Sequence, residues 1–321
     1  MSQSVLILGG AGFVGCQLVE QLQRRGVWVT VVTRHFEAAR RVLHQPRVRV
    51  VMADITDDFS TLTTLVAAHD AVVNLVAILH GDQAQFEHVH IELPRRIALA
   101  CAQAGGRRLV HVSALGATAD GPSMYQRSKA DGEAVLNQAA RDGALGLTVL
   151  RPSVIFGTGD RFLNLFAQLQ KLLPIVPLAG AAARFQPVWV RDVAQAIAIC
   201  LQERATIGRT YEACGPEFWR LRELVRAAGQ WAGVRGGRGR PVFALPQTLG
   251  RLQALALEWM PGPTLMSRDN LASLAVDNVA SGLLPGLTAL GIAPAPLSTV
   301  GPLILGRNSP QARMDAYRKT E

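Results

Sequence analysis

A chain of 321 residues with 49% hydrophobic side chains can bury one large core, or one core with a smaller lobe attached to it. Its net charge of +9 favours anionic partners such as phosphorylated small molecules or acidic lipid surfaces. The most basic run, from Arg235 to Arg240, has no interleaved aromatic residue, so nucleic acid is not expected as a partner.

Short β-branched runs alternate with helical patterns through the first half of the chain. The expected strands are Val5–Leu8, Val29–Thr33, Val48–Met52, Ala71–Leu75, Leu109–Val112 and Leu147–Leu150. Helices are expected between them, among others at Phe13–Arg25, Leu93–Ala104 and Tyr125–Arg141. This alternation, with strands that are apolar on both faces, predicts an α/β fold: a doubly wound parallel sheet of the Rossmann type.

After Arg151 the alternation becomes less regular, and helical patterns remain at Arg161–Leu172, Asp192–Gln202 and Leu221–Ala232. Asp192 follows a strand-like run, Pro187–Val190, and is a candidate helix cap. We expect two more strands for the sheet from this half, together with a smaller C-terminal lobe. The expected domains are a Rossmann core at 1–155 completed by about 185–215, a lobe at 156–184 and 216–306, and a polar tail at 307–321.

No charged residue occurs between Asn278 and Gly306. Prolines and glycines interrupt this stretch too often for a membrane-spanning helix, so a buried lobe or a membrane-touching surface is expected instead. The N-terminus runs directly into the first strand, so we expect that apolar run to be structural. The four cysteines are widely spaced without a C-x-x-C pair, which predicts reduced thiols and a cytoplasmic location, or a peripheral one on the inner face of a membrane.

A glycine-rich turn follows the first strand and opens the first helix. Its sequence is Gly9-Gly-Ala-Gly12-Phe-Val-Gly15. The three spaced glycines allow a tight turn, close approach of a pyrophosphate to the backbone, and close packing of the helix on the strand. We therefore predict dinucleotide binding by Gly9, Ala11, Gly12, Phe13, Val14 and Gly15, with the pyrophosphate at the helix N-terminus.

The residue after the second strand indicates which dinucleotide is bound. An NAD site usually places Asp or Glu about 20 residues beyond the turn, where it holds the ribose hydroxyls. This chain has Arg34 there, and a guanidinium pairs with a 2′-phosphate where a carboxylate would repel it. The sequence therefore favours NADP(H) over NAD(H), with Asp54 and Ile55 as expected neighbours of the adenine ring.

Several further motifs follow the layout of extended short-chain dehydrogenases/reductases. They are Asn74-Leu-Val-Ala77, His111-Val-Ser-Ala114, Tyr125-x-x-x-Lys129 and Arg151-Pro-Ser-Val-Ile-Phe-Gly157. Later segments resemble the NADPH-binding accessory subunit of respiratory complex I and its bacterial relatives: Phe156–Phe166, Gln186–Val193 and Leu290–Leu297. The resemblance runs from about residue 4 to residue 306. It implies that Leu75, Val76, Ala77, Tyr125, Lys129 and Pro152 also contact the cofactor.

The resemblance also implies a catalytic mechanism. In catalytic members of this family, a lysine ammonium lowers the pKa of the tyrosine so that its phenol exchanges a proton during hydride transfer. Tyr125 and Lys129 are the matching pair. The serine or threonine that contacts the substrate is replaced by Ala114, which donates no hydrogen bond. Ser113 is expected to bond backbone at the strand end, which makes it a doubtful catalytic residue, and Ser123 is a candidate substitute.

Histidines and acids crowd the segment from His80 to Glu92, but His88 and His90 would point to different faces of a helix, so no metal site is expected. Two functions remain open, beside a nucleic-acid or transcript regulator that senses NADP, which only the basic charge supports. The first is an accessory or assembly protein that holds NADP(H) and docks on a respiratory or quinone-handling protein. The second is an NADP-dependent oxidoreductase or epimerase acting on a quinone precursor, a lipid or a nucleotide sugar. The sequence does not decide between them.

Overall fold

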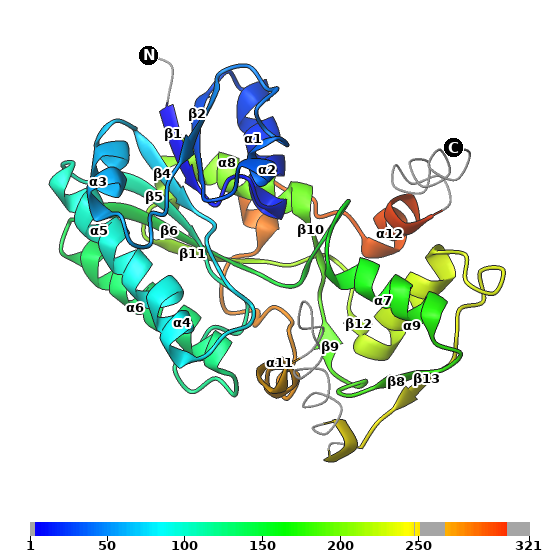
Figure 1. Cartoon of the computed structure of the whole chain (residues 1–321). Coiled ribbons are helices and arrows are strands. Elements are labelled where there is room, and N and C mark those ends of the chain that lie inside the picture. The colour runs from blue at the N-terminus through cyan, green and yellow to red at the C-terminus, as the bar shows by residue number, and fades with distance from the viewer. Residues whose placement is uncertain (1–3, 247, 251–266, 307–321) are drawn as a thin grey trace. The chain divides into compact units, whose positions relative to one another are not determined.

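The chain folds into two compact units (Figure 1). This computed structural model describes residues 4–246, 248–250 and 267–306. The first unit comprises Met1–Pro152, Val190–Ala213 and Ser281–Ile292, and the second comprises Ser153–Trp189, Cys214–Ala280 and Ala293–Glu321. The sequence had placed all of 216–306 in the smaller lobe, whereas Ser281–Ile292 belongs to the first unit. This segment pairs with the sheet edge, since Glu212 N donates to Pro285 O at 3.0 Å.

A seven-stranded parallel sheet forms the centre of the first unit, in the order β11-β6-β5-β4-β1-β2-β3. The strands are β1 (Ser4–Leu8), β2 (Trp28–Thr33), β3 (Val48–Met52), β4 (Ala71–Asn74), β5 (Arg107–Val112), β6 (Leu145–Pro152) and β11 (Arg209–Ala213). The strand order reverses between β1 and β4, and ligands of such sheets bind at the carboxyl ends of the strands near that reversal. The predicted doubly wound sheet is confirmed.

Helices cover the sheet because its strands are apolar on both sides. Leu6 and Ile7 of β1 and Leu109 and Val110 of β5 are fully buried. One layer packs α3 against α5 and α5 against α6, and α1 packs on α8 (Figure 1). The helices are α1 (Phe13–Arg24), α2 (Phe36–Ala39), α3 (Phe59–Ala67), α4 (Gln83–Glu87), α5 (Leu93–Gln103), α6 (Met124–Arg141) and α8 (Val190–Gln202), with short helical turns at His88–Glu92, Arg204–Thr206 and Leu287–Leu290.

Two expectations for the second half of the chain were wrong. Only β11 is added to the large sheet, because the strand-like run ends in a two-residue strand, β10 (Val188–Trp189), that pairs with β7 (Ile155–Phe156). Asp192 does not cap α8, since the helix already begins at Val190 and Asp192 lies in its first turn.

The second unit is built from short elements around its own apolar core. Besides β7 and β10 they are α7 (Phe162–Leu172), β8 (Val176–Leu178), β9 (Arg184–Phe185), β12 (Trp219–Arg220), α9 (Leu221–Trp231), β13 (Val242–Ala244), α11 (Arg268–Ser273) and α12 (Leu297–Leu305). The core joins Leu163 and Phe166 of α7 to Leu224 of α9 and Leu297 of α12. Strands β8 and β13 pair as one two-stranded sheet and β9 and β12 as another.

Within the described residues, no helix is both long and apolar enough to cross a membrane. The four cysteines are unpaired, and three of them are buried. The predicted polar tail at 307–321 lies outside the described residues.

Candidate functional site

The glycine turn after β1 has the backbone conformation that the motif requires. Gly9 has a φ of +80°, and Gly12 N donates to Gly9 O at 3.0 Å. A Cβ atom at Gly15 would lie 2.4 Å from Gly10 O, so only glycine lets α1 pack this closely. A Cβ atom at Gly12 would meet only Gly9 O, at 3.1 Å, and would otherwise project into open space. The turn is therefore closed toward the protein and open at Gly12.

The start of α1 is suited to an anion. Gly12 is the residue before the helix and has no side chain to bond the amide groups of the first turn. Phe13 and Val14 are half-buried and Ala11 is buried, so these residues shape the turn around those amides. The combination of helix amides that no side chain caps and a missing Cβ is what a pyrophosphate group needs.

The other residues predicted to bind the cofactor lie at the carboxyl ends of neighbouring strands. A Cβ atom at Gly9 would lie 3.3 Å from the carbonyl carbon of Leu75 and 3.4 Å from Val76 N, so the segment after β4 lies against the turn. Ala77, next in this segment, is exposed. Pro152 is buried at the end of β6, where its carbonyl accepts from Leu115 N at 2.9 Å.

Arg34 and Asp54 meet at the ends of β2 and β3. Arg34 Nη1 lies 3.4 Å from Asp54 Oδ2, and both side chains are substantially exposed. Burial acts to raise the pKa of Asp54, but hydrogen bonds from Thr56 and the charge of Arg34 lower it overall, so this carboxylate stays ionised. Ile55 is buried beside it. A guanidinium is thus available at the edge where the sequence predicts the 2′-phosphate.

Tyr125 and Lys129 lie one turn apart on α6, and the structure shows them in unequal environments. The Tyr125 ring packs edge-on against His90, with ring centroids 5.6 Å apart, and burial raises the pKa of Tyr125 to about 12. Burial lowers the pKa of Lys129 to about 8, although nearby Glu133 acts to raise it. The expectation that the ammonium lowers the pKa of the tyrosine does not hold here, because burial dominates and Lys129 Nζ instead donates to Val112 O at 3.0 Å.

The two candidate serines have exchanged the roles expected of them. Ser123 is fully buried at the start of α6, where its hydroxyl accepts from Gln126 N at 3.1 Å and donates to Gln126 Oε1 at 2.9 Å. It caps the helix and has no hydrogen left for a substrate. Ser113 does not bond backbone as expected: its buried Oγ has no hydrogen-bond partner within the described residues. Ala114, next in the chain, is 7% exposed.

A buried histidine network beneath Tyr125 was not found by sequence reasoning. His90 lies in a π-helical turn, and its Nε2 accepts from Ile78 N at 3.1 Å. Its Nδ1 therefore carries the proton and donates to Ser128 Oγ, 2.9 Å away, while Ser128 Oγ donates to Tyr125 O at 3.0 Å. Burial and the charge of Lys129 lower the pKa of His90 to about 3, so its ring is neutral. The sequence signal was weak, since a π-helical turn has no composition of its own.

Among the described residues, no three His, Cys, Asp or Glu side chains group together in a way that could hold a metal ion. His88 lies 3.3 Å from Asp57 and His90 is engaged by Ser128, so the two histidines face different partners.

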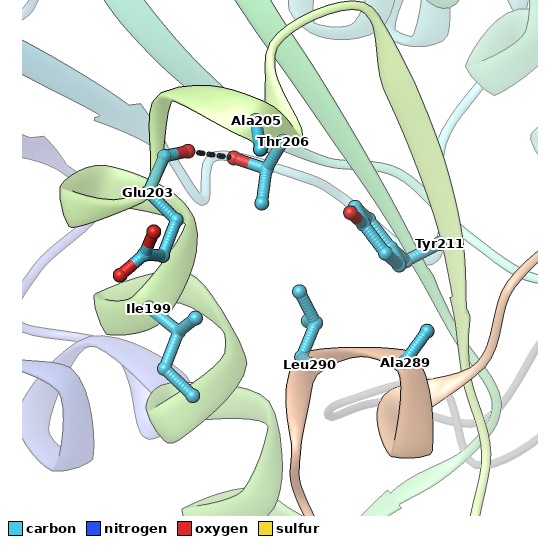
Figure 2. A pocket seen from close by; sticks show the side chains of 7 residues that line it. All are labelled: Ile199, Glu203, Ala205, Thr206, Tyr211, Ala289 and Leu290. Atoms are coloured by element: carbon cyan, nitrogen blue, oxygen red, sulfur yellow. Dashed lines mark hydrogen bonds between the residues drawn. The ribbon is translucent and has the colours of Figure 1, made fainter.

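A cavity of about 450 Å³ lies at the β11 edge of the sheet in the first unit. Figure 2 shows its lining side chains converging from α8, the turn after it, β11 and the turn at Leu287–Leu290: Ile199, Glu203, Ala205, Thr206, Tyr211, Ala289 and Leu290. Thr206 Oγ1 is occupied by a 2.7 Å bond to Glu203 O. The only charged group of the lining is a carboxylate, so this cavity is unsuited to the phosphates of a nucleotide.

Comparison with known proteins identifies the family. The model of the NAD dependent epimerase/dehydratase family matches residues 5–214, which include every predicted site residue. The chain belongs to this family. Such proteins are extended short-chain dehydrogenases/reductases, as the motifs predicted.

Two groups of relatives stand out. The chain is 30% identical over 298 residues to the mitochondrial NADH dehydrogenase [ubiquinone] 1 alpha subcomplex subunit 9 of Arabidopsis thaliana, covering 86% of this chain and 70% of that protein. The rat protein of the same name is 29% identical over 94% of this chain and 79% of its own length. A ceramide reductase from Caulobacter vibrioides is 30% identical over 61% of this chain and 60% of its own length.

Solved structures share the fold. The crystal structure of gox2253 has a TM-score of 0.71 with 21% identity, covering 93% of this chain and 96% of that one. A UDP-glucose 4-epimerase from Thermotoga maritima has a TM-score of 0.65 with 19% identity, covering 85% of this chain and 97% of that one.

Proposed function

We propose that this protein holds NADP(H) as an accessory or assembly factor of a respiratory or quinone-handling complex. The observation that carries the proposal is the combination of a complete dinucleotide turn with Ala114 at the position of the substrate-contacting hydroxyl. A protein built to turn over a substrate would keep that hydroxyl, because losing one such hydrogen bond costs about 100-fold or more in rate. The relatives that match most of the chain carry the name of a complex I subunit, which also supports an accessory function.

The cofactor-binding residues of the proposal are those at the carboxyl edge of the sheet. Gly9, Gly12 and Gly15 would hold the pyrophosphate, Arg34 the 2′-phosphate, and Asp54 with Ile55 would border the adenine. Lys129 would reach the nicotinamide ribose once its ammonium leaves Val112 O. The nucleotide, when bound, would supply a hydride carrier. We assign these roles to residues 1–155 completed by about 185–215, and partner contact to the smaller lobe.

The proposed place of action is the inner face of a membrane, where respiratory and quinone-handling proteins work. The cytoplasmic side is favoured by four unpaired cysteines, three of them buried, in a chain with no C-x-x-C pair.

A second candidate function is an NADP-dependent reductase. One specific observation favours it: the buried Ser113 Oγ has no partner within the described residues and lies one residue from Ala114. A buried hydroxyl left unpaired costs stability unless it serves a ligand. Ser113 with Tyr125 and Lys129 would then form the active site, and the ceramide reductase relative suggests a lipid carbonyl as substrate.

Purification without added nucleotide tests both candidates. We expect the protein to carry NADP(H), detectable by fluorescence and by release on denaturation. Under the accessory function, the reduced nicotinamide of bound NADPH keeps its absorbance at about 340 nm when quinones, sphingoid ketones or nucleotide sugars are added. Steady oxidation with one of these substrates would instead establish the reductase. A protein that binds neither nucleotide contradicts both.

A further inference from the structure

The second unit has an exposed apolar surface on the outer side of the β8–β13 sheet. Leu172 at the end of α7 is 79% exposed, Phe243 is 57% exposed and Ile175 is 48% exposed. Pro177 and Phe243 are direct partners in the strand register. We call these four residues the β8–β13 face.

The outward direction of this face is set by the strand alternation. Val176 and Leu178 are 1% and 3% exposed and belong to the apolar core of the second unit. Their neighbours Ile175 and Pro177 therefore point the opposite way, as successive side chains of a strand must. The core already uses the inner side of this small sheet, so the apolar side chains on its outer side serve something else.

A rim of cations adjoins the face. Lys171 precedes Leu172, and the loop from Arg235 to Arg240 returns directly to it, since Val176 N donates to Pro241 O at 3.0 Å. The buried amide of Gln170 fixes that loop through a 2.5 Å bond from Arg240 N. Lys171, Arg235 and Arg238 are exposed.

Acids of the described residues do not pair with these cations. Lys171, Arg235, Arg238 and Arg240 form no ion pair within the described residues, and Arg240 Nε is buried there without a hydrogen-bond partner. The two chain segments that build the surface contain no acid, since none occurs between Asp160 and Asp192 or between Glu223 and Glu258. These two segments therefore bring apolar and cationic side chains to the surface and no acid of their own.

We propose that the β8–β13 face, with its rim of Lys171, Arg235, Arg238 and Arg240, docks on an anionic lipid bilayer. Exposed aliphatic and aromatic side chains enter the boundary between headgroups and acyl chains, while the surrounding cations pair with lipid phosphates. A nucleic acid fits less well, because three of the four apolar residues offer no aromatic ring for stacking. This docking proposal rests on the peripheral location proposed above and assigns a defined surface to it. That surface is distinct from the uncharged stretch at Asn278–Gly306, which has no cation to attract acidic lipid.

Flotation of the full chain with vesicles tests this surface. We expect binding to vesicles of phosphatidylcholine and phosphatidylglycerol in equal parts, weakening with added salt, and little binding to phosphatidylcholine alone. The double variant Arg235→Gln/Arg238→Gln should lower the partition coefficient by about fivefold per cation. Leu172→Ser/Phe243→Ser should remove the salt-resistant part of the binding. The matched control, Arg49→Gln/Leu99→Ser, changes exposed residues of the first unit and should bind vesicles like the unmodified chain.

Nucleotide affinity and melting temperature are measured on every variant, so a folding defect is distinguished from loss of docking. A chain that binds nucleotide but ignores anionic vesicles overturns the docking surface and leaves the proposed function standing. Equal vesicle binding by the control and by the variants of the face overturns it as well. If the unmodified chain is instead a dimer that Leu172→Ser/Phe243→Ser dissociates, the face is an interface between copies and the lipid proposal is wrong. A chain that binds vesicles but no nucleotide overturns the proposed function alone.

Discussion

Arg34 Nη1 lies 3.4 Å from Asp54 Oδ2, so the first residue after the β2 strand is held by the second residue after β3. This carboxylate orients the guanidinium without burying it. A 2′-phosphate arriving at the edge of the sheet would gain a bidentate partner that is already placed. The pair also shows why sequence alone assigned both residues to the adenosine end of the site.

Replacing Arg34 tests the cofactor preference. We expect NADPH to bind more tightly than NADH, and Arg34→Asp to remove most of the difference by repelling the 2′-phosphate. Hydrogen bonds between charged groups contribute about 1.5–3 kcal/mol, and the exposure of Arg34 places the effect near the lower end, about tenfold in Kd. Titration of both nucleotides by calorimetry measures it. Equal affinities for NADPH and NADH in the unmodified protein would contradict the NADP assignment.

Two glycine substitutions separate binding from folding. Gly12→Val should abolish nucleotide binding while leaving the fold intact, because its side chain meets only Gly9 O and otherwise fills the open space of the turn. Gly15→Val should destabilise the protein, since its Cβ would lie 2.4 Å from Gly10 O. Thermal melting and nucleotide titration of both variants check the contrast. Tight nucleotide binding by a folded Gly12→Val protein would place the site elsewhere.

The sheet could be predicted from sequence because its strands are continuous apolar runs. Each of the six strands expected in the first half matches an observed one to within two residues, and β6 is the longest departure, at Leu145–Pro152 rather than Leu147–Leu150. The family was equally accessible, since the glycine turn and the Tyr125/Lys129 spacing are local motifs. Pairing between distant segments could not be predicted from local motifs. Ser281–Ile292 was therefore assigned to the smaller lobe, although it pairs with β11.

Most details of the candidate site depended on tertiary surroundings, although Ser123-x-x-Gln126 is itself a local helix-capping pattern. Ser123 is close to Tyr125 in sequence, yet its hydroxyl is used up at the start of α6. Ser113 was expected to bond backbone, and its oxygen is instead unpaired among the described residues. The pKa of Tyr125 followed from burial rather than from its spacing to Lys129. Protonation and hydrogen bonding are set by tertiary surroundings, so the sequence could name the residues without assigning their roles.

Burial of Lys129 predicts an unusual pH dependence of stability. Its pKa falls from 10.5 to about 8 on folding, so between these two values the unfolded chain binds more protons than the folded one. Stability should therefore rise as pH increases from about 8 toward 10.5, by up to about 3 kcal/mol from this group. Lys129→Met should remove that rise.

Denaturant unfolding of both proteins at several pH values measures the effect. Raised pKa values of Tyr125, Cys101 and Cys200 lower stability above about pH 9, but the variant retains these groups. The difference between the unmodified protein and Lys129→Met therefore isolates the lysine. The two proteins could instead differ in unfolding free energy by a constant amount between about pH 8 and about pH 10, the range in which the shift acts. That result would show that Lys129 remains charged in the folded protein.

Comparing Tyr125→Phe with Gly12→Val distinguishes an accessory protein from an enzyme. Tyr125→Phe should leave nucleotide affinity almost unchanged, because the phenol is expected to face substrate and the ring keeps its packing against His90. In cells that lack the native gene product, an accessory protein needs the nucleotide but not the phenol, so Tyr125→Phe should restore growth and Gly12→Val should not. An enzyme needs both, since without the phenol no proton accompanies the hydride. Ala114 leads us to expect the accessory outcome.

Ala114→Ser is a control variant that restores the missing hydroxyl at almost no change in volume. Under the accessory function it should leave the cellular role intact. A Tyr125→Phe protein that is folded, carries nucleotide and fails to restore growth would establish the reductase instead.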